Sequence, residues 1–183
     1  KLKIEEVNEL SKYNIPIVMI GNHVNGERLC SVYVDIEKAI YELTSKYLEE
    51  GKEKIAILED RKNPYTCDQM VKGAERAFKQ RNKEFNGFLK IPAEDRTSYS
   101  FLSKHLKDHS YDLIIANRDS QAMAVINSAR ENQLDVPNDL EVVCVIDSKY
   151  NSVMRPQISS FSIPSYDLGA VSMRVMTKML QSE

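Results

Sequence analysis

Apolar residues along the chain follow two patterns, one typical of covered strands and one typical of helices. Short continuous apolar runs, such as Ile55–Leu58 and Leu113–Ile115, predict strands that are buried on both faces. Between them, apolar residues recur every three or four positions, which predicts helices. We predict strands at 15–20, 31–34, 55–58, 87–91, 112–116, 141–146 and 158–163, and helices at 4–10, 36–50, 70–79, 97–107, 119–131 and 167–180.

Strands that alternate with helices predict an α/β fold with doubly wound parallel sheets. Asp35 can cap the helix 36–50, and Gly51 can end it in a left-handed conformation. The strand 158–163 alternates apolar and polar residues, so we expect it near an edge of its sheet. Ligands of such sheets bind beyond the carboxyl ends of the strands, which here are Gly21, Asp60, 117–119 and 146–148.

The composition is that of a soluble globular protein. Of the 183 residues, 42% are hydrophobic and 28% are charged, and no apolar run reaches the roughly 18 residues that a membrane span needs. The net charge of −2 gives no basic footprint for nucleic acid, so we do not expect this segment to bind DNA. Three separated cysteines and an N-terminus without a signal-peptide pattern favour a reduced, cytoplasmic protein.

The chain carries no residue constellation typical of an enzyme. The motifs G-x-S-x-G, G-x-G-x-x-G, C-x-x-C and the P-loop are all absent. His105 and His109 have the i,i+4 spacing of a zinc site, but no Glu follows His105 and no third ligand is apparent. We interpret this pair as part of a solvated helix face, and we expect neither catalytic residues nor a metal nor another cofactor.

Two polar groups of residues are candidates for binding. At the junction of a strand and a helix, Arg118 could meet an anion and Asp119 could accept hydroxyls, although a simple N-cap explains the residues equally well. On the last helix, Asp167, Arg174 and Lys178 share one face. Arg174 and Lys178 repel each other, and an external anion would relieve that repulsion. The alternative is that these two basic residues only offset the negative end of the helix dipole. From physical principles alone, this alternative is favoured over an anion site.

The C-terminal third of the chain carries the motifs of a known family. They are Asp135-Val136-Pro137-Asn138-Asp139-Leu140-Glu141, Met154-Arg155-Pro156-Gln157 and Tyr166-Asp167-Leu168-Gly169-Ala170-Val171-Ser172-Met173-Arg174-Val175-Met176-Thr177-Lys178. This region resembles the effector domain of the lactose-repressor (LacI) family of transcription regulators, and most closely its catabolite control branch. Weaker agreement extends across nearly the whole chain.

The resemblance implies a type I periplasmic-binding-protein-like fold with two lobes, preceded by a helix-turn-helix headpiece that binds operator DNA. Residues 1–51 and 156–183 would form part of the N-terminal lobe, and residues 52–155 the C-terminal lobe. The headpiece and the first half of the N-terminal lobe would then lie outside this chain. The resemblance also implies a homodimer.

In the catabolite control branch, the corepressor is a protein, the histidine-containing phosphocarrier protein phosphorylated on a serine. The resemblance implies that Tyr166, Asp167, Val171, Arg174 and Lys178 form the docking helix, with Arg174 and Lys178 near the phosphoserine. The resemblance therefore favours phosphoserine binding over the dipole explanation for Arg174 and Lys178.

The small-molecule cleft departs from the family pattern. Met70 stands where the family usually has Arg, Arg118-Asp119 replaces a common Asn-Asp pair, and Asp147 lies one residue after the usual effector-binding Asp. These departures argue against induction by a simple sugar. The alternatives are a LacI-type regulator that senses a small sugar or phosphosugar, reached by Arg118, and a solute-binding receptor for transport.

Overall fold

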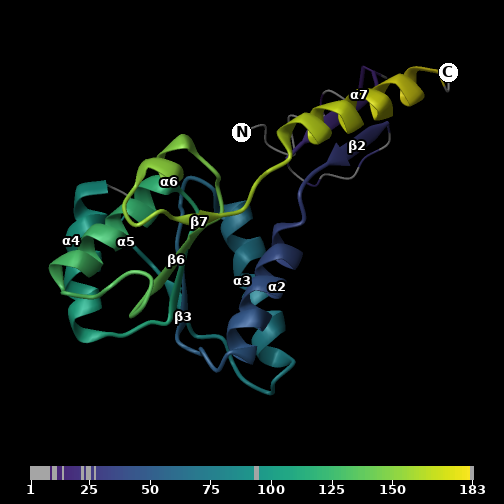
Figure 1. Cartoon of the computed structure of the whole chain (residues 1–183). Coiled ribbons are helices and arrows are strands. Elements are labelled where there is room, and N and C mark those ends of the chain that lie inside the picture. The colour runs from purple at the N-terminus through teal and green to yellow at the C-terminus, as the bar shows by residue number, and fades with distance from the viewer. Residues whose placement is uncertain are drawn as a thin grey trace. The chain divides into compact units, whose positions relative to one another are not determined.

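The computed structural model describes residues 9, 12–13, 15–21, 23, 26, 28–92 and 95–181, apart from the side chains of 95 and 96. The chain divides into two compact units, one of residues 1–34 and 163–183 and the other of Asp35–Ser162 (Figure 1). The helix that we predicted at 4–10 lies outside the described residues, with the exception of Glu9. No helix in the described part of the chain is both long and apolar enough to cross a membrane.

Among its described residues, the smaller unit contains two parallel strands and a long C-terminal helix. Strand β1 (Ile17–Ile20) pairs with β2 (Leu29–Val32), with Ile17 opposite Leu29. Helix α7 (Ser165–Gln181) contacts both strands. Within α7, Ser172 is buried against the strands, so this side of the helix is the one that packs.

The larger unit is built on a five-stranded parallel sheet in the order β4-β3-β5-β6-β7, which confirms the predicted parallel α/β fold. The strands are β3 (Ile55–Leu58), β4 (Phe88–Leu89), β5 (Leu113–Ala116), β6 (Glu141–Cys144) and β7 (Ser159–Ser160). The helices are α2 (Ile36–Glu49), α3 (Pro64–Lys79), α4 (Asp95–Asp108), α5 (Asp119–Glu131) and α6 (Lys149–Val153). β7 lies at an edge of the sheet, as its alternating sequence predicted.

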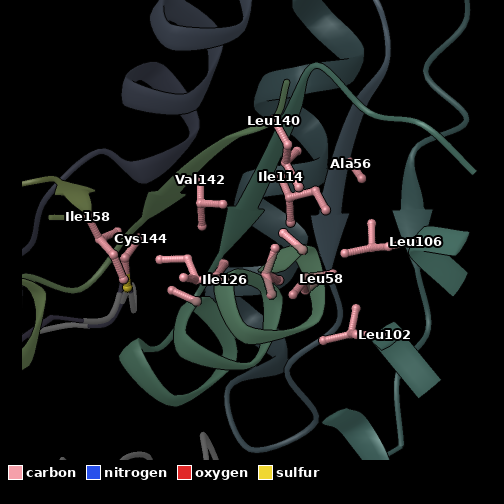
Figure 2. Close-up of a cluster of buried hydrophobic side chains, with 14 of the residues drawn as sticks. Ala56, Leu58, Leu102, Leu106, Ile114, Ile126, Leu140, Val142, Cys144 and Ile158 are labelled. Atoms are coloured by element: carbon pink, nitrogen blue, oxygen red, sulfur yellow. The ribbon is translucent and has the colours of Figure 1, made fainter. Parts of the chain in front are cut away.

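Helices cover both faces of this sheet, and each face has its own hydrophobic core. Along β3, Ala56 and Leu58 face the core formed with α4 and α5, while Ile55 and Ile57 face the core formed with α2 and α3. Figure 2 shows the first of these cores, where Leu102 and Leu106 of α4 and Ile126 of α5 meet the strands. Burial on both faces explains why these strands have continuous apolar sequences.

Two predicted helix signals are confirmed by the local geometry of α2. Asp35 Oδ1 accepts a hydrogen bond of 2.9 Å from the backbone N–H of Lys38, as an N-cap residue does. At the other end, Gly51 has a φ of +79°, the left-handed conformation that ends many helices. Gly73 on α3 allows close packing of the two helices, because a Cβ there would lie 2.4 Å from the carbonyl oxygen of Glu37.

Several predicted boundaries differ from the structure. Helix α3 begins at Pro64, six residues before the predicted start, and the five-residue helix α6 was not predicted. The compact units divide at residues 35 and 163, and the predicted lobe boundaries of 51 and 156 stay a prediction. Helix α2 belongs to the larger unit because its apolar residues pack in that unit's core.

Candidate functional site

Polar side chains from three strand ends converge at the carboxyl edge of the larger sheet, where we predicted a ligand site. Asp60 follows β3, Asn117 and Arg118 follow β5, and Ser148 follows β6. Because the carboxyl ends of parallel strands lie at one edge, these residues are brought together although they are distant in sequence. We call Asp60, Asn117, Arg118, Asp119 and Ser148 the strand-end cluster.

Asp60 is the buried centre of the strand-end cluster, with a side chain only 1% exposed. Asn117 Nδ2 donates a hydrogen bond of 2.8 Å to Asp60 Oδ2, and the backbone N–H of Lys62 donates one of 3.0 Å to Oδ1. Arg118 Nε lies 3.3 Å from Oδ2 in an ion pair that lacks hydrogen-bond alignment. Because this carboxylate is almost fully buried and already accepts two hydrogen bonds, it offers a ligand little access.

Asp119 and Asp147 also have partners within the protein. Ser148 Oγ donates to Asp119 Oδ2 at 2.9 Å, and the backbone N–H of Ser120 donates to Asp119 Oδ1 at 2.7 Å. Asp147 is exposed and accepts a hydrogen bond of 3.0 Å from Ser160 Oγ. The two carboxylates therefore contact different elements, with Asp147 turned toward β7.

Gln121 of α5 also contacts the strand-end cluster, and it was not predicted from the sequence. Its Oε1 accepts hydrogen bonds from the backbone N–H groups of Asn117 and Arg118, and its Nε2 donates to the carbonyl of Glu59 at 2.8 Å. This side chain ties the ends of β3 and β5 to α5. Its position three residues after the N-cap of α5 is the capping-box spacing, which was the available signal.

Met70 lies outside the strand-end cluster, and its place in an effector cleft stays a prediction. It is fully buried in the core between α2, α3 and the sheet. The physical reason is helical periodicity, since Met70 shares its face of α3 with the buried Ala74 and Ala77.

The predicted docking helix presents an exposed face in the smaller unit. Asp167, Val171, Arg174 and Lys178 are all exposed, and at 100° per residue they fall within an arc of about 60°. Tyr166 is 88% exposed but lies well outside this arc. We call the four residues within the arc the α7 outer face.

His105 of α4 and His109, which directly follows that helix, form a stacked pair. The described residues contain no group of three or more metal-ligating side chains. The His105 and His109 rings stack with centroids 4.2 Å apart, and His105 Nε2 lies 2.7 Å from the Tyr111 hydroxyl. Burial lowers the pKa of His105, and the nearby His109 lowers it further. A stacked pair with one nitrogen already bonded is poorly arranged to share an ion.

Comparisons with known proteins place the chain in a family. The periplasmic binding protein-like domain family matches residues 44–183. Catabolite control protein A of Priestia megaterium is 28% identical over 183 residues, which cover 98% of this chain and 55% of that protein. The chain therefore spans about half the length of this relative.

Solved structures of transcription regulators share the fold. The transcription regulator CcpA of Lactococcus lactis is 26% identical, with a TM-score of 0.76 over 98% of this chain and 67% of that chain. A LacI-family regulatory protein from Chloroflexus aggregans is 19% identical, with a TM-score of 0.83 over 96% of this chain and 64% of that chain, which shows the fold alone.

The chain thus belongs to the periplasmic binding protein-like domain family, and within that family it is related to catabolite control protein A and to the LacI-type transcription regulators.

Proposed function

We propose that this chain is the effector-sensing part of a cytoplasmic LacI-type transcription regulator of carbon catabolite control. In this proposal a serine-phosphorylated phosphocarrier protein is the corepressor, and it docks on the α7 outer face. The complete protein would be a homodimer that binds operator DNA through a headpiece outside this chain.

The observation that carries the proposal is the exposed pair of cations on the α7 outer face. Arg174 and Lys178 lie one helical turn apart, and both are exposed. Arg174 makes no ion pair within the described part of the chain. A phosphate group would accept charge-assisted hydrogen bonds from the Arg174 guanidinium, with Lys178 adding positive charge one turn away. Val171 adds an apolar contact, since it is 41% exposed on the same face.

The strand-end cluster supports the choice of a protein corepressor over a simple sugar. A sugar is held by side chains that accept hydrogen bonds from its hydroxyls. Here Asp60 and Asp119 already accept hydrogen bonds from Asn117 and Ser148. A neutral sugar would have to compete with these internal partners for the two carboxylates.

Titration of the phosphocarrier protein against the full-length regulator tests this proposal. We expect binding of the serine-phosphorylated carrier and much weaker binding of the unphosphorylated carrier. Arg174→Ala should lower the affinity for the phosphorylated carrier by roughly tenfold to a hundredfold, because a hydrogen bond to a charged group contributes about 1.5–3 kcal/mol. Equal affinity for both carriers, or an affinity unchanged by Arg174→Ala, contradicts the docking proposal.

A phosphorylated sugar is the second candidate effector, and the state of Arg118 favours it over a neutral sugar. The Arg118 side chain is 25% exposed and contacts Asp60 through Nε, so its terminal nitrogens can reach an anion. A ligand at about a hundred times its Kd should add about 2.7 kcal/mol to the free energy of unfolding. Thermal shifts with a panel of sugars and sugar phosphates, repeated on Arg118→Ala, would detect this. A shift that persists in the variant excludes Arg118 as the anion contact.

A further inference from the structure

A cavity of about 470 Å³ lies at the amino-terminal end of the larger sheet. Its lining includes Lys54 just before β3, Gly87 just before β4 and Tyr111 just before β5. Because the strands are parallel, this is the end of the sheet opposite to the strand-end cluster. The cavity is therefore separate from the strand-end cluster.

Aromatic rings form part of the cavity wall. Phe78 of α3 and Phe85 have ring centroids 5.5 Å apart with an angle of 55° between the rings. Phe78 is 6% exposed, so its ring is held firmly by the core, whereas Phe85 and Tyr111 are half-buried at the cavity. The face of an aromatic ring carries negative electrostatic potential, which attracts cations.

Carboxylates outnumber cations at the same cavity. Glu53, Glu84 and Asp108 line it, and the one lysine among the lining residues, Lys54, donates a hydrogen bond of 2.9 Å to Ser110 Oγ. Glu53 is paired with Lys83, but Glu84 forms no hydrogen bond or ion pair within the described residues. The excess charge is therefore negative.

Two helices also end at this cavity, which strengthens the negative potential. Phe78 lies in the last turn of α3, and Asp108 is the last residue of α4. The dipole of a helix places a partial negative charge at its C-terminus. Rings, carboxylates and helix ends thus all favour a positively charged occupant.

We propose that this cavity binds a small organic cation, namely an ammonium group attached to a compact apolar body. The apolar body packs on Phe78 and Phe85, and the ammonium group lies near Glu84 and Asp108. An anion is disfavoured by the carboxylates, and a neutral apolar molecule gains nothing from them. This proposal does not depend on the α7 outer face or on the regulator assignment.

The test compares two probes of nearly the same shape, phenethylammonium and the uncharged 2-phenylethanol. Each is titrated into the full chain, and amide chemical shifts are followed by NMR. We expect saturable shifts at Phe85, Gly87 and His109 with the ammonium probe, and an affinity for the alcohol that is severalfold weaker. Equal affinity for the two probes, or no saturable shift with the ammonium probe, overturns the proposal.

Variants of the lining residues sharpen the test. Glu84→Gln and Asp108→Asn should each weaken the ammonium probe by roughly twofold to fivefold, and Phe85→Leu should do the same because it removes a ring but keeps an apolar side chain. Glu75→Gln is the matched control, since Glu75 lies on α3 but not at this cavity. An affinity that all three lining variants leave unchanged overturns the proposal.

Discussion

Asp60 shows how a buried charge at the residue scale is held by neighbours from distant parts of the chain. Its carboxylate accepts hydrogen bonds from Asn117 Nδ2 and the Lys62 N–H, and it lies in an ion pair with Arg118. Asp60→Ala should lower the free energy of unfolding by about 3 kcal/mol, because it leaves a buried amide and a partly buried guanidinium without their partner. Chemical denaturation measures this loss.

Asp68→Ala provides the matched control for the Asp60 substitution. Asp68 pairs with Lys72 at 2.8 Å, but its side chain is 55% exposed. An exposed ion pair contributes less than about 1 kcal/mol, so this variant should be nearly as stable as the wild type. Similar losses of the free energy of unfolding in the two variants would contradict this account, because burial would then not explain the effect of the Asp60 substitution.

His105 predicts a dependence of stability on pH. Burial lowers its pKa below the ordinary 6.5, His109 lowers it further, and Asp108 opposes the shift. The unfolded chain therefore binds a proton at this position more readily than the folded chain does. This contribution to stability is complete above the unfolded pKa and is lost as the pH falls through 6.5 toward the lowered pKa of the folded state.

Denaturation curves between about pH 7.5 and pH 5.5 test this expectation. His105→Gln should lose less stability than the wild type over this interval, because glutamine does not titrate. If the wild type and the variant lose the same free energy of unfolding over this interval, the role of His105 is contradicted, whatever their absolute stabilities.

The residues of the strand-end cluster could be predicted in part from the sequence. The rule that ligand-binding residues follow parallel strands identified Asp60, Asn117, Asp119 and Ser148, and the structure brings them together. The rule could not show that these groups bind one another, because hydrogen-bond partners depend on side-chain directions. Gln121 was missed for the same reason.

At the scale of elements, the N-cap of α2 gives a prediction of its own. Asp35→Ala removes the acceptor for the Lys38 N–H and should lower the free energy of unfolding by about 1 kcal/mol. Asp35→Asn should retain most of the stability, since asparagine is an equally good N-cap residue. Denaturation of the two variants checks this, and equal losses would mean that charge rather than capping is responsible.

The elements themselves were predicted where apolar periodicity was strong. Strands β3 and β5 are covered on both faces, and the positions predicted from their continuous apolar sequences agree closely with the structure. Helix α3 was predicted too short, because its first turn has no apolar pattern, although Pro64 at the start of the helix was a usable signal. Helix α6 spans five residues, which is too short for any periodicity.

At the scale of the whole molecule, the resemblance predicted the fold, and the packing of α2 decides how the chain divides into compact units. The structure separates the units at residues 35 and 163, because Ile40, Tyr47 and Leu48 of α2 pack with α3 on the larger sheet. The order of strands and helices in a sequence does not say which sheet a helix covers. That the two units correspond to the two lobes stays a prediction.

The central claim is that the α7 outer face recognises a phosphorylated protein. The most direct measurement is the affinity of the full-length regulator for the serine-phosphorylated and the unphosphorylated carrier. It is made on two double variants, each of which removes two positive charges. Arg174→Ala with Lys178→Ala should abolish the preference for the phosphorylated carrier. Lys104→Ala with Lys107→Ala, on exposed positions of α4, should leave it intact. A preference that survives the α7 substitutions, or that both double variants weaken equally, would contradict the account.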